Sequence, residues 1–185
     1  MVRALYLLGI LAILGAADTL YFHEWRAKLP GLGKHARAEL QLHAARDFIY
    51  ALLFSTLPWI RWQGNWAVVL ALLLLAEVML TLWDFVVEDW IRKPLGGVYP
   101  AERIMHGVMG IVYGAMLAYL IPGLHAWWLS STDLTVSAVA VPSAFRWAML
   151  AMGVGVLASG VRDICASFEI RGSAWPWTRP TSLQV

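Results

Sequence analysis

The sequence predicts an all-α integral membrane protein built as a bundle of five transmembrane helices. Three observations lead to this class: the composition, five long apolar stretches and an abundance of interfacial aromatic residues. Of the 185 residues, 60% are hydrophobic and 14% are charged, whereas globular chains have about 45–50% apolar and about 25% charged residues. The 11 Trp and 6 Tyr residues suit two membrane–water interfaces, where amphipathic rings settle. A net charge of +2 does not indicate a nucleic-acid partner, so the lipid bilayer is the expected partner.

Five stretches have the roughly 20 mostly apolar residues that a helix needs to cross about 30 Å of hydrocarbon. They cover residues 3–25, 36–57, 65–91, 100–120 and 142–168. Each of the first four is followed by a proline, which helices disfavour: Pro30, Pro58, Pro94 and Pro122. Pro100 and Pro142 open the last two stretches, at the first-turn position where the missing N–H has no helical partner. We expect one domain over 1–172 and a cytoplasmic tail over 173–185.

The first stretch and the longest connection each have a distinctive composition. The first begins like a signal peptide, with Arg3, an apolar run and the small residues Gly15-Ala16-Ala17. The apolar run continues to Phe22, so we expect a retained helix. The long connection 123–141 contains Trp127 and Trp128, and we expect it to lie along an interface.

Basic residues predict the orientation, because cytoplasmic segments carry the excess of Lys and Arg. After five crossings one side holds most of them: Arg26, Lys28, Lys34, Arg37, Arg92, Lys93, Arg103, Arg162, Arg171 and Arg179. The other side holds Arg3, Arg61 and Arg146. We therefore expect the N-terminus outside and the C-terminus in the cytoplasm, in a bacterial inner membrane. Arg92, Lys93 and Arg103, with Asp89, are interpreted as ordinary loop residues on the cytoplasmic side.

Ionisable residues also occur inside the expected helices. A charge in hydrocarbon is costly, so each is a candidate functional residue. Glu39, His43 and Asp47 are spaced at i, i+4 and i+8, which places them on one helix face. The other candidates lie on the first, third and fourth stretches: Asp18, His23, Glu77, Asp84, Glu88, Glu102 and His106.

Most of these candidates fall in two layers near the cytoplasmic end. At a rise of 1.5 Å per residue, four residues reach one depth, about 10 Å from the cytoplasmic boundary: Asp18, His43, Asp84 and His106. One helical turn nearer the cytoplasm lie His23, Glu39, Glu88 and Glu102. His23 fits least well, because a residue five positions after Asp18 points away from it on an ideal α-helix. The sequence therefore predicts a polar site among the first four helices.

Packed carboxylates repel one another unless cations neutralise them. Only Arg46 and Arg162 are expected inside the bundle, so a pair of divalent metal ions would neutralise the acids better. Helix bundles that hold two metals use single acids from two helices and Glu-x-x-His from two others. Here the second and fourth stretches carry Glu-x-x-x-His, one residue longer. We predict that two Fe, Mn or Zn ions are held by seven ligands: Asp18, Glu39, His43, Asp84, Glu88, Glu102 and His106.

Other polar and small residues are expected to support this site. Arg46, Asp47 and Glu77 would orient the ligands through hydrogen bonds, and His23 is an alternative ligand. Arg162 and Asp163 are interpreted as a local ion pair. Six glycines are expected at helix–helix contacts: Gly107, Gly110, Gly114, Gly153, Gly155 and Gly160.

Three functional hypotheses follow. The first is a metal-dependent enzyme acting on an amphipathic or lipid-like substrate, either a di-iron-type oxidoreductase or a zinc or manganese hydrolase; bundle-held carboxylate sites favour the oxidoreductase by analogy. The second is a proton or cation transporter in which Glu77 continues the path, although the outer half offers few polar groups. The third is a haem b protein with His43 and His106 as axial ligands. Soluble catalytic motifs, such as a glycine-rich phosphate loop, are missing.

Overall fold

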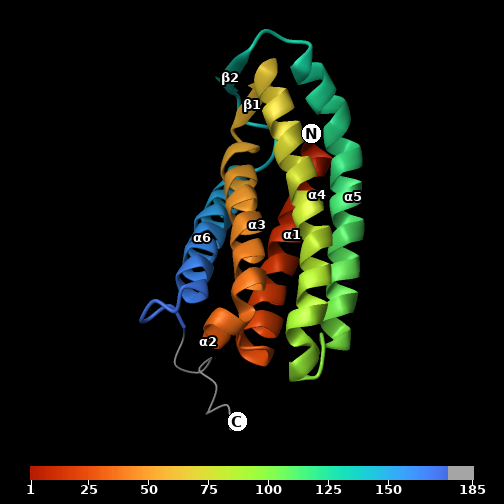
Figure 1. Ribbon diagram of the computed structural model, residues 1–185. Coiled ribbons are helices and arrows are strands. Elements are labelled where there is room, and N and C mark those ends of the chain that lie inside the picture. The colour runs from red at the N-terminus through yellow and green to blue at the C-terminus, as the bar shows by residue number, and fades with distance from the viewer. Residues whose placement is uncertain (175–185) are drawn as a thin grey trace.

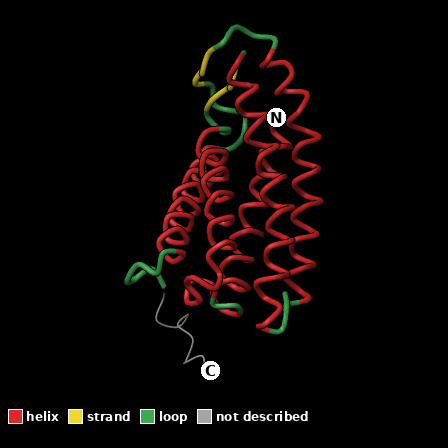
Figure 2. Tube along the Cα trace, in the orientation of Figure 1, coloured by secondary structure: helices red, strands yellow, loops and turns green. Residues whose placement is uncertain are grey.

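A computed structural model describes residues 1–174, which are mostly helical (Figures 1 and 2). The long helices are α1 (Val2–Asp18), α3 (Arg37–Thr56), α4 (Asn65–Arg92), α5 (Pro100–Trp128) and α6 (Ser143–Ser167). Between them lie shorter elements: η1 (Thr19–Arg26), α2 (Leu29–Leu32), η2 (Gly33–Ala36), β1 (Ile60–Gln63), η3 (Lys93–Leu95) and β2 (Asp133–Val136). The prediction that the chain folds as a bundle of helices is therefore confirmed. Most of the expected tail, residues 175–185 with Arg179, lies outside the described part.

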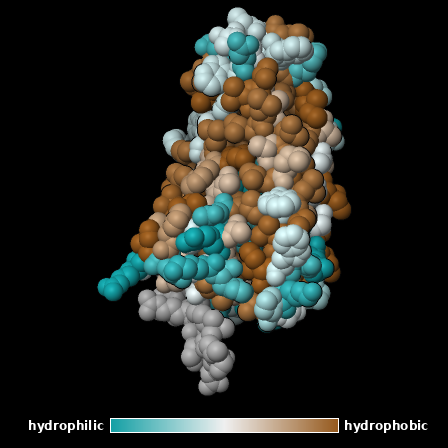
Figure 3. All heavy atoms as spheres, in the orientation of Figure 1, coloured by the Kyte–Doolittle hydropathy of each residue, from teal (hydrophilic) through white to brown (hydrophobic). Residues whose placement is uncertain are grey.

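Four helical stretches are long and apolar enough to cross a membrane: Val2–Arg26, Asn65–Leu95, Pro100–Trp128 and Ser143–Ser167. The helix α3, predicted as a further crossing, has 20 residues but does not join this group, because Glu39, Arg46 and Asp47 interrupt its apolar character. On the face shown in Figure 3, apolar residues cover the middle of the bundle and hydrophilic residues gather toward its two ends.

The long helices pack side by side along the bundle (Figure 1). Helix α3 packs against α4 and α6, and α5 packs against α1 and α4. Helices α1 and α6 share only a small contact. The packing between α1 and α6 is therefore loose.

The interior is divided along the length of the bundle. Apolar side chains fill the half next to β1 and β2, with Leu8, Leu53, Leu70 and Met116 at most 1% exposed. The other half, at the lower end in Figure 1, encloses ionisable residues. Those buried are Asp18, His23, Glu24, Glu39, His43, Glu77, Asp84, Glu88, Arg92, Glu102 and Asp163.

Helix α5 is longer than the sequence predicts. The fourth stretch was expected to end at residue 120, before Pro122 and Gly123, but the helix continues through Pro122 to Trp128. A proline inside a helix removes one hydrogen bond. Contacts beyond it offset this loss, because Trp127 packs on the apolar core and its carbonyl accepts a hydrogen bond from the Gly64 N–H at 2.8 Å. Trp127 and Trp128 therefore lie on a helix and not in the loop expected over 123–141.

The sequence pattern also did not predict the two-stranded sheet at this end. Strands β1 and β2 pair antiparallel, with Ile60 opposite Val136 and Gln63 opposite Asp133. Gly64 follows β1 at φ 57°, and a Cβ atom there would lie 2.5 Å from the Thr132 Cα. Only glycine meets both requirements. This two-stranded sheet closes the apolar half of the bundle, opposite the buried charges.

Candidate metal centre

The first helical stretch changes from α-helix to π-helix at Thr19. Five residues along an α-helix correspond to a rotation that leaves the side chains about 140° apart. The π-helix η1 hydrogen-bonds from i to i+5, so its wider turn returns His23 to the face of Asp18. The His23 Nε2 atom lies 3.4 Å from Asp18 Oδ2. The expectation that His23 points away from Asp18 was therefore wrong. Single turns of π-helix inside α-helices are frequent at functional sites.

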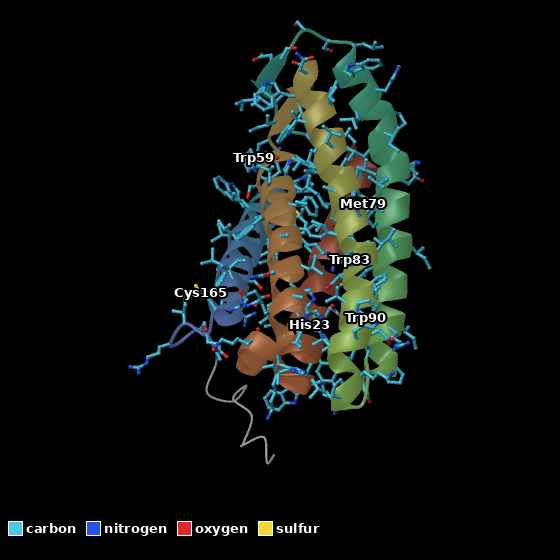
Figure 4. All side chains as sticks on the ribbon, in the orientation of Figure 1. His23, Trp59, Met79, Trp83, Trp90 and Cys165 are labelled. Atoms are coloured by element: carbon cyan, nitrogen blue, oxygen red, sulfur yellow. The ribbon has the colours of Figure 1, made fainter. Side chains whose placement is uncertain are left out.

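Asp18, His23 and His106 form a first group of candidate ligands. Asp18 Oδ2 lies 3.2 Å from His106 Nε2, in addition to its contact with His23. Each residue can offer one ligand atom such that the three atoms lie within 4.8 Å of one another. Figure 4 shows His23 among the helices toward the lower end of the bundle. One carboxylate and two imidazoles, from α1, η1 and α5, can thus face a single ion.

Glu88, Glu102 and His106 form a second group. The His106 Nδ1 atom lies 3.5 Å from Glu88 Oε1, so the imidazole faces carboxylates at both of its nitrogens. Phe85 stacks on this ring with centroids 5.3 Å apart, which holds its orientation. The three ligand atoms again lie within 4.8 Å of one another. Glu102 Oε1 is also 3.3 Å from His23 Nε2, which joins the two groups.

His43 and Asp84 lie beside these groups. The His43 Nε2 atom is 3.3 Å from Asp84 Oδ2, and the His43 ring stacks on His23 with centroids 4.4 Å apart. Arg46 donates a hydrogen bond to Asp84 Oδ2 at 2.8 Å. Within the described residues 1–174, neither His43 nor Asp84 belongs to a group of three that could hold an ion. Both surround the candidate ligands instead.

Arg92 is the important residue that sequence reasoning missed. Its side chain is 3% exposed, and it donates to Glu39 Oε1 at 2.8 Å and 2.5 Å and to Glu102 Oε1 at 2.7 Å. The interpretation of Arg92 as an ordinary loop residue was therefore wrong. It follows Asp84 and Glu88 at i, i+4 and i+8, and that spacing was the available signal. Glu39 is paired with Arg92 and is in neither candidate group.

Glu77 lies deepest among the buried acids and ends the polar region. It accepts hydrogen bonds from Tyr50 at 2.9 Å and Thr81 at 2.8 Å. The Arg46 Nε atom is 3.5 Å away, so Arg46 connects Glu77 with Asp84. Beyond Glu77 the bundle is filled by the apolar core around Leu70.

A second set of charges lies on α6. Arg162 donates to Asp163 Oδ1 at 2.8 Å, which confirms the expected ion pair. Arg162 also pairs with Glu24 of η1. Asp47, Glu24 and Asp163 all line one cavity.

A cavity of about 480 Å³ opens on the first group of candidate ligands, between α1, α3 and α6. Its lining is polar toward one end, where it includes Asp18, His23 and Asp163. Toward the other end it is apolar, with Leu11 and Phe54. An ion bound by Asp18 and His23 would thus face a space with a polar and an apolar end.

The glycines behave differently on the two helices. Gly153 and Gly160 pack tightly against α3, where a Cβ at Gly160 would lie 2.9 Å from the Asp47 Cβ. The prediction of helix contacts was right for these two. It was wrong for the other four, which have open space around the position of a Cβ atom: Gly107, Gly110, Gly114 and Gly155. Gly110 and Gly114 line a second cavity of about 280 Å³, which reaches Glu77, and Gly155 lines the first.

No protein-family model, curated protein or solved structure matches the chain. Its function is therefore inferred from the side chains themselves.

Proposed function

We propose that this protein is an integral membrane metalloenzyme that holds two divalent ions in the polar half of its bundle and acts on a lipid-like substrate. The observation that carries the proposal is the group of Asp18, His23 and His106, of which Asp18 and His23 line the cavity. These residues would supply two imidazoles and one carboxylate to an ion. This ligand set is typical of non-haem iron oxygenases.

The charge of the interior supports bound cations. Among the described residues, eight buried side chains are carboxylates: Asp18, Glu24, Glu39, Glu77, Asp84, Glu88, Glu102 and Asp163. Three arginines, Arg46, Arg92 and Arg162, contact them. Buried charges without partners are strongly destabilising. Two divalent ions would offset most of the remaining negative charge.

Asp18, His23 and His106 would hold the first ion, and Glu88, Glu102 and His106 would hold the second. His106 could bind both ions only as the imidazolate, after losing its N–H proton. Relative to the sequence-based hypothesis, His23 replaces His43 as a ligand. Glu39, His43 and Asp84 would then surround the two ions without binding them. Arg46 would orient the Asp84 carboxylate, and Arg92 would orient the Glu39 carboxylate.

Carboxylate and imidazole ligands suit iron, manganese and zinc. We favour iron and an oxidoreductase, because the first group matches the ligand set of iron oxygenases. An iron ion would supply oxygen activation, whereas zinc or manganese would supply a water activated for hydrolysis. In either case the chain contributes a water-poor cavity and fixes the ligands.

We place the four apolar helices and α3 across a bacterial inner membrane, with the polar half near the cytoplasm and the N-terminus outside. The lower end of the bundle carries the basic residues Lys34 in η2, Lys93 in η3 and Arg103 in the first turn of α5, which favours this orientation.

The two alternatives have less support. A transport path would have to continue beyond Glu77, where Leu70, Leu74 and Met116 fill the bundle. A haem held by His43 and His106 would have to displace His23, whose ring lies 4.4 Å from that of His43 and 6.3 Å from that of His106. A flat macrocycle therefore fits this region less well than small ions.

The metal content of protein purified in detergent without chelator tests the proposal. We expect about two ions per chain, and expect His106→Ala to lose both because its ring adjoins both groups. The loss of affinity should exceed the roughly 10–100-fold effect of removing an outer partner. His125→Ala is the matched control, since His125 is an exposed imidazole on the same helix.

Absence of metal from the unaltered protein would refute the proposal. A Soret band in its visible spectrum would replace it with the haem alternative. Asp18→Asn serves as a second variant if His106→Ala does not fold, because it removes a ligand charge with almost no change of shape.

A further inference from the structure

We propose that the cavity between α1, α3 and α6 binds a single-chain amphiphile whose head group donates hydrogen bonds and carries no negative charge. The inference that this molecule is the substrate of the metal centre rests on the proposed function. The inference that it binds in the cavity does not, because the residues of the cavity wall alone recognise it.

The shape of the cavity matches a molecule with one polar and one apolar end. Its lining on α6 extends from Met152 to Asp163, about 16 Å at 1.5 Å per residue. The end at Met152 also contains Leu11 and Phe54, and the end at Asp163 contains Asp47. Binding sites for small molecules commonly have volumes of about 300–1,000 Å³, and this cavity has about 480 Å³.

The charges at the polar end select the head group. Arg46 forms ion pairs with Asp84 and Glu77, although its Nε atom, 3.5 Å from Glu77 Oε1, makes no hydrogen bond among the described residues. Arg162 is occupied by Asp163 and Glu24. Asp47 adds a further carboxylate to the lining. A phosphate or carboxylate head would thus meet acids and no free guanidinium group, which disfavours it strongly in a buried site.

A buried acceptor at this end points to a donor on the ligand. Glu24 is 5% exposed and lines the cavity, and its Oε2 atom is buried without a hydrogen-bond partner among the described residues. Buried acceptors normally have partners, because their desolvation is otherwise uncompensated. A hydroxyl or amine head can donate to Glu24, whereas an ether or ester head cannot.

The amphiphile would reach the cavity from the side. Helices α1 and α6 share only a small contact, and the lining between them includes Leu20, which is 67% exposed, and the exposed residues Gly155 and Ala158. The two small residues leave the gap wide. The opening therefore lies along the apolar flank of the bundle, where a lipid chain would be dissolved.

Photolabelling of the full chain in nanodiscs tests the inference, with the metal content of each sample measured in parallel. The probe is hexadecanol carrying a diazirine in its chain, and the competitors are unlabelled hexadecanol, hexadecylamine and hexadecyl phosphate. We expect labels on cavity residues of α1, α3 and α6, and competition by the phosphate at least about tenfold weaker than by the alcohol. Asp47→Asn should make the phosphate a stronger competitor relative to the alcohol, because it removes one carboxylate from the lining.

Gly155→Phe should fill the cavity and reduce labelling at least about tenfold. Gly107→Phe is the matched control, because Gly107 is also an exposed helical glycine with no atom within 4 Å of a Cβ, and it lines neither cavity. Ala158→Phe replaces Gly155→Phe if the latter does not fold. Labels spread evenly over the bundle, equal competition by the phosphate, or equal effects of Gly155→Phe and Gly107→Phe would each overturn the inference. Specific labelling of protein that contains no metal would support the amphiphile site and refute only the proposal of a metalloenzyme.

Discussion

Replacing Arg92 by Met is expected to be among the most destabilising single changes in this bundle. The guanidinium group makes three hydrogen bonds of 2.5–2.8 Å to Glu39 and Glu102, in a place where its side chain is 3% exposed. Its removal leaves the buried Glu39 carboxylate without a cation and takes one cation away from Glu102. Breaking a buried ion pair in this way costs about 3–5 kcal/mol. For a chain of this size each kcal/mol corresponds to roughly 2–4 °C, so the Tm should fall by about 6–20 °C.

Thermal unfolding in detergent, followed by tryptophan fluorescence, measures this shift. Arg103→Met is the matched control, because Arg103 also contacts an acid, Asp89, at 2.7 Å. Both of those side chains are more than half exposed, so the loss should be about 0–1 kcal/mol. Adding Glu39→Gln and Glu102→Gln to Arg92→Met should recover much of the stability, since the stranded charges are then gone. Equal, small shifts for the Arg92 and Arg103 variants would refute the reasoning.

Two further predictions concern packing and pH. Gly160→Ala should lower the free energy of unfolding by about 1–3 kcal/mol, because its Cβ would crowd Asp47 and Phe48; Gly107→Ala, which meets open space, should be neutral or stabilising, and equal denaturation midpoints would contradict this. The Lys34 backbone N–H and its ammonium group hold the pKa of Glu169 below its usual range. The contact therefore stabilises the fold above the ordinary carboxyl pKa and is lost as pH falls through the lowered value. In Lys34→Ala the backbone N–H remains, so an NMR titration should show the Glu169 pKa rising only part of the way to the ordinary carboxyl value. No rise would exclude a contribution from the ammonium group.

The helices and the polar half could be predicted because they depend on local patterns. Apolar runs and proline positions located all five long-helix starts to within about one residue of those in the structure. The depth of each acid and imidazole followed from helical rise alone. The end of α5 could not be predicted in this way, since Pro122 is retained through contacts of Trp127 with distant residues. The two-stranded sheet depends likewise on the pairing of Ile60 with Val136, far along the chain.

The errors within the candidate site have two physical origins. His23 was misplaced because nothing in the composition of 19–26 distinguishes a π-helix from an α-helix. Arg92 was misjudged because a basic residue near a helix end fits the orientation rule, which concealed its spacing from Asp84 and Glu88. The four exposed glycines show that small residues on a helix can mark an open face as readily as a close contact.

The π-helix also bears on how such a chain could vary. One α-helical turn separates Glu39 from His43, and one separates Glu102 from His106. The wider turn of η1 separates Asp18 from His23. Deleting one residue between Asp18 and His23 would allow an ordinary α-helix to present the same two side chains together. A chain with Asp-x-x-x-His at this point, and one with Asp-x-x-x-x-His, would then have the same arrangement of side chains. A search for other proteins with this centre should accept both spacings.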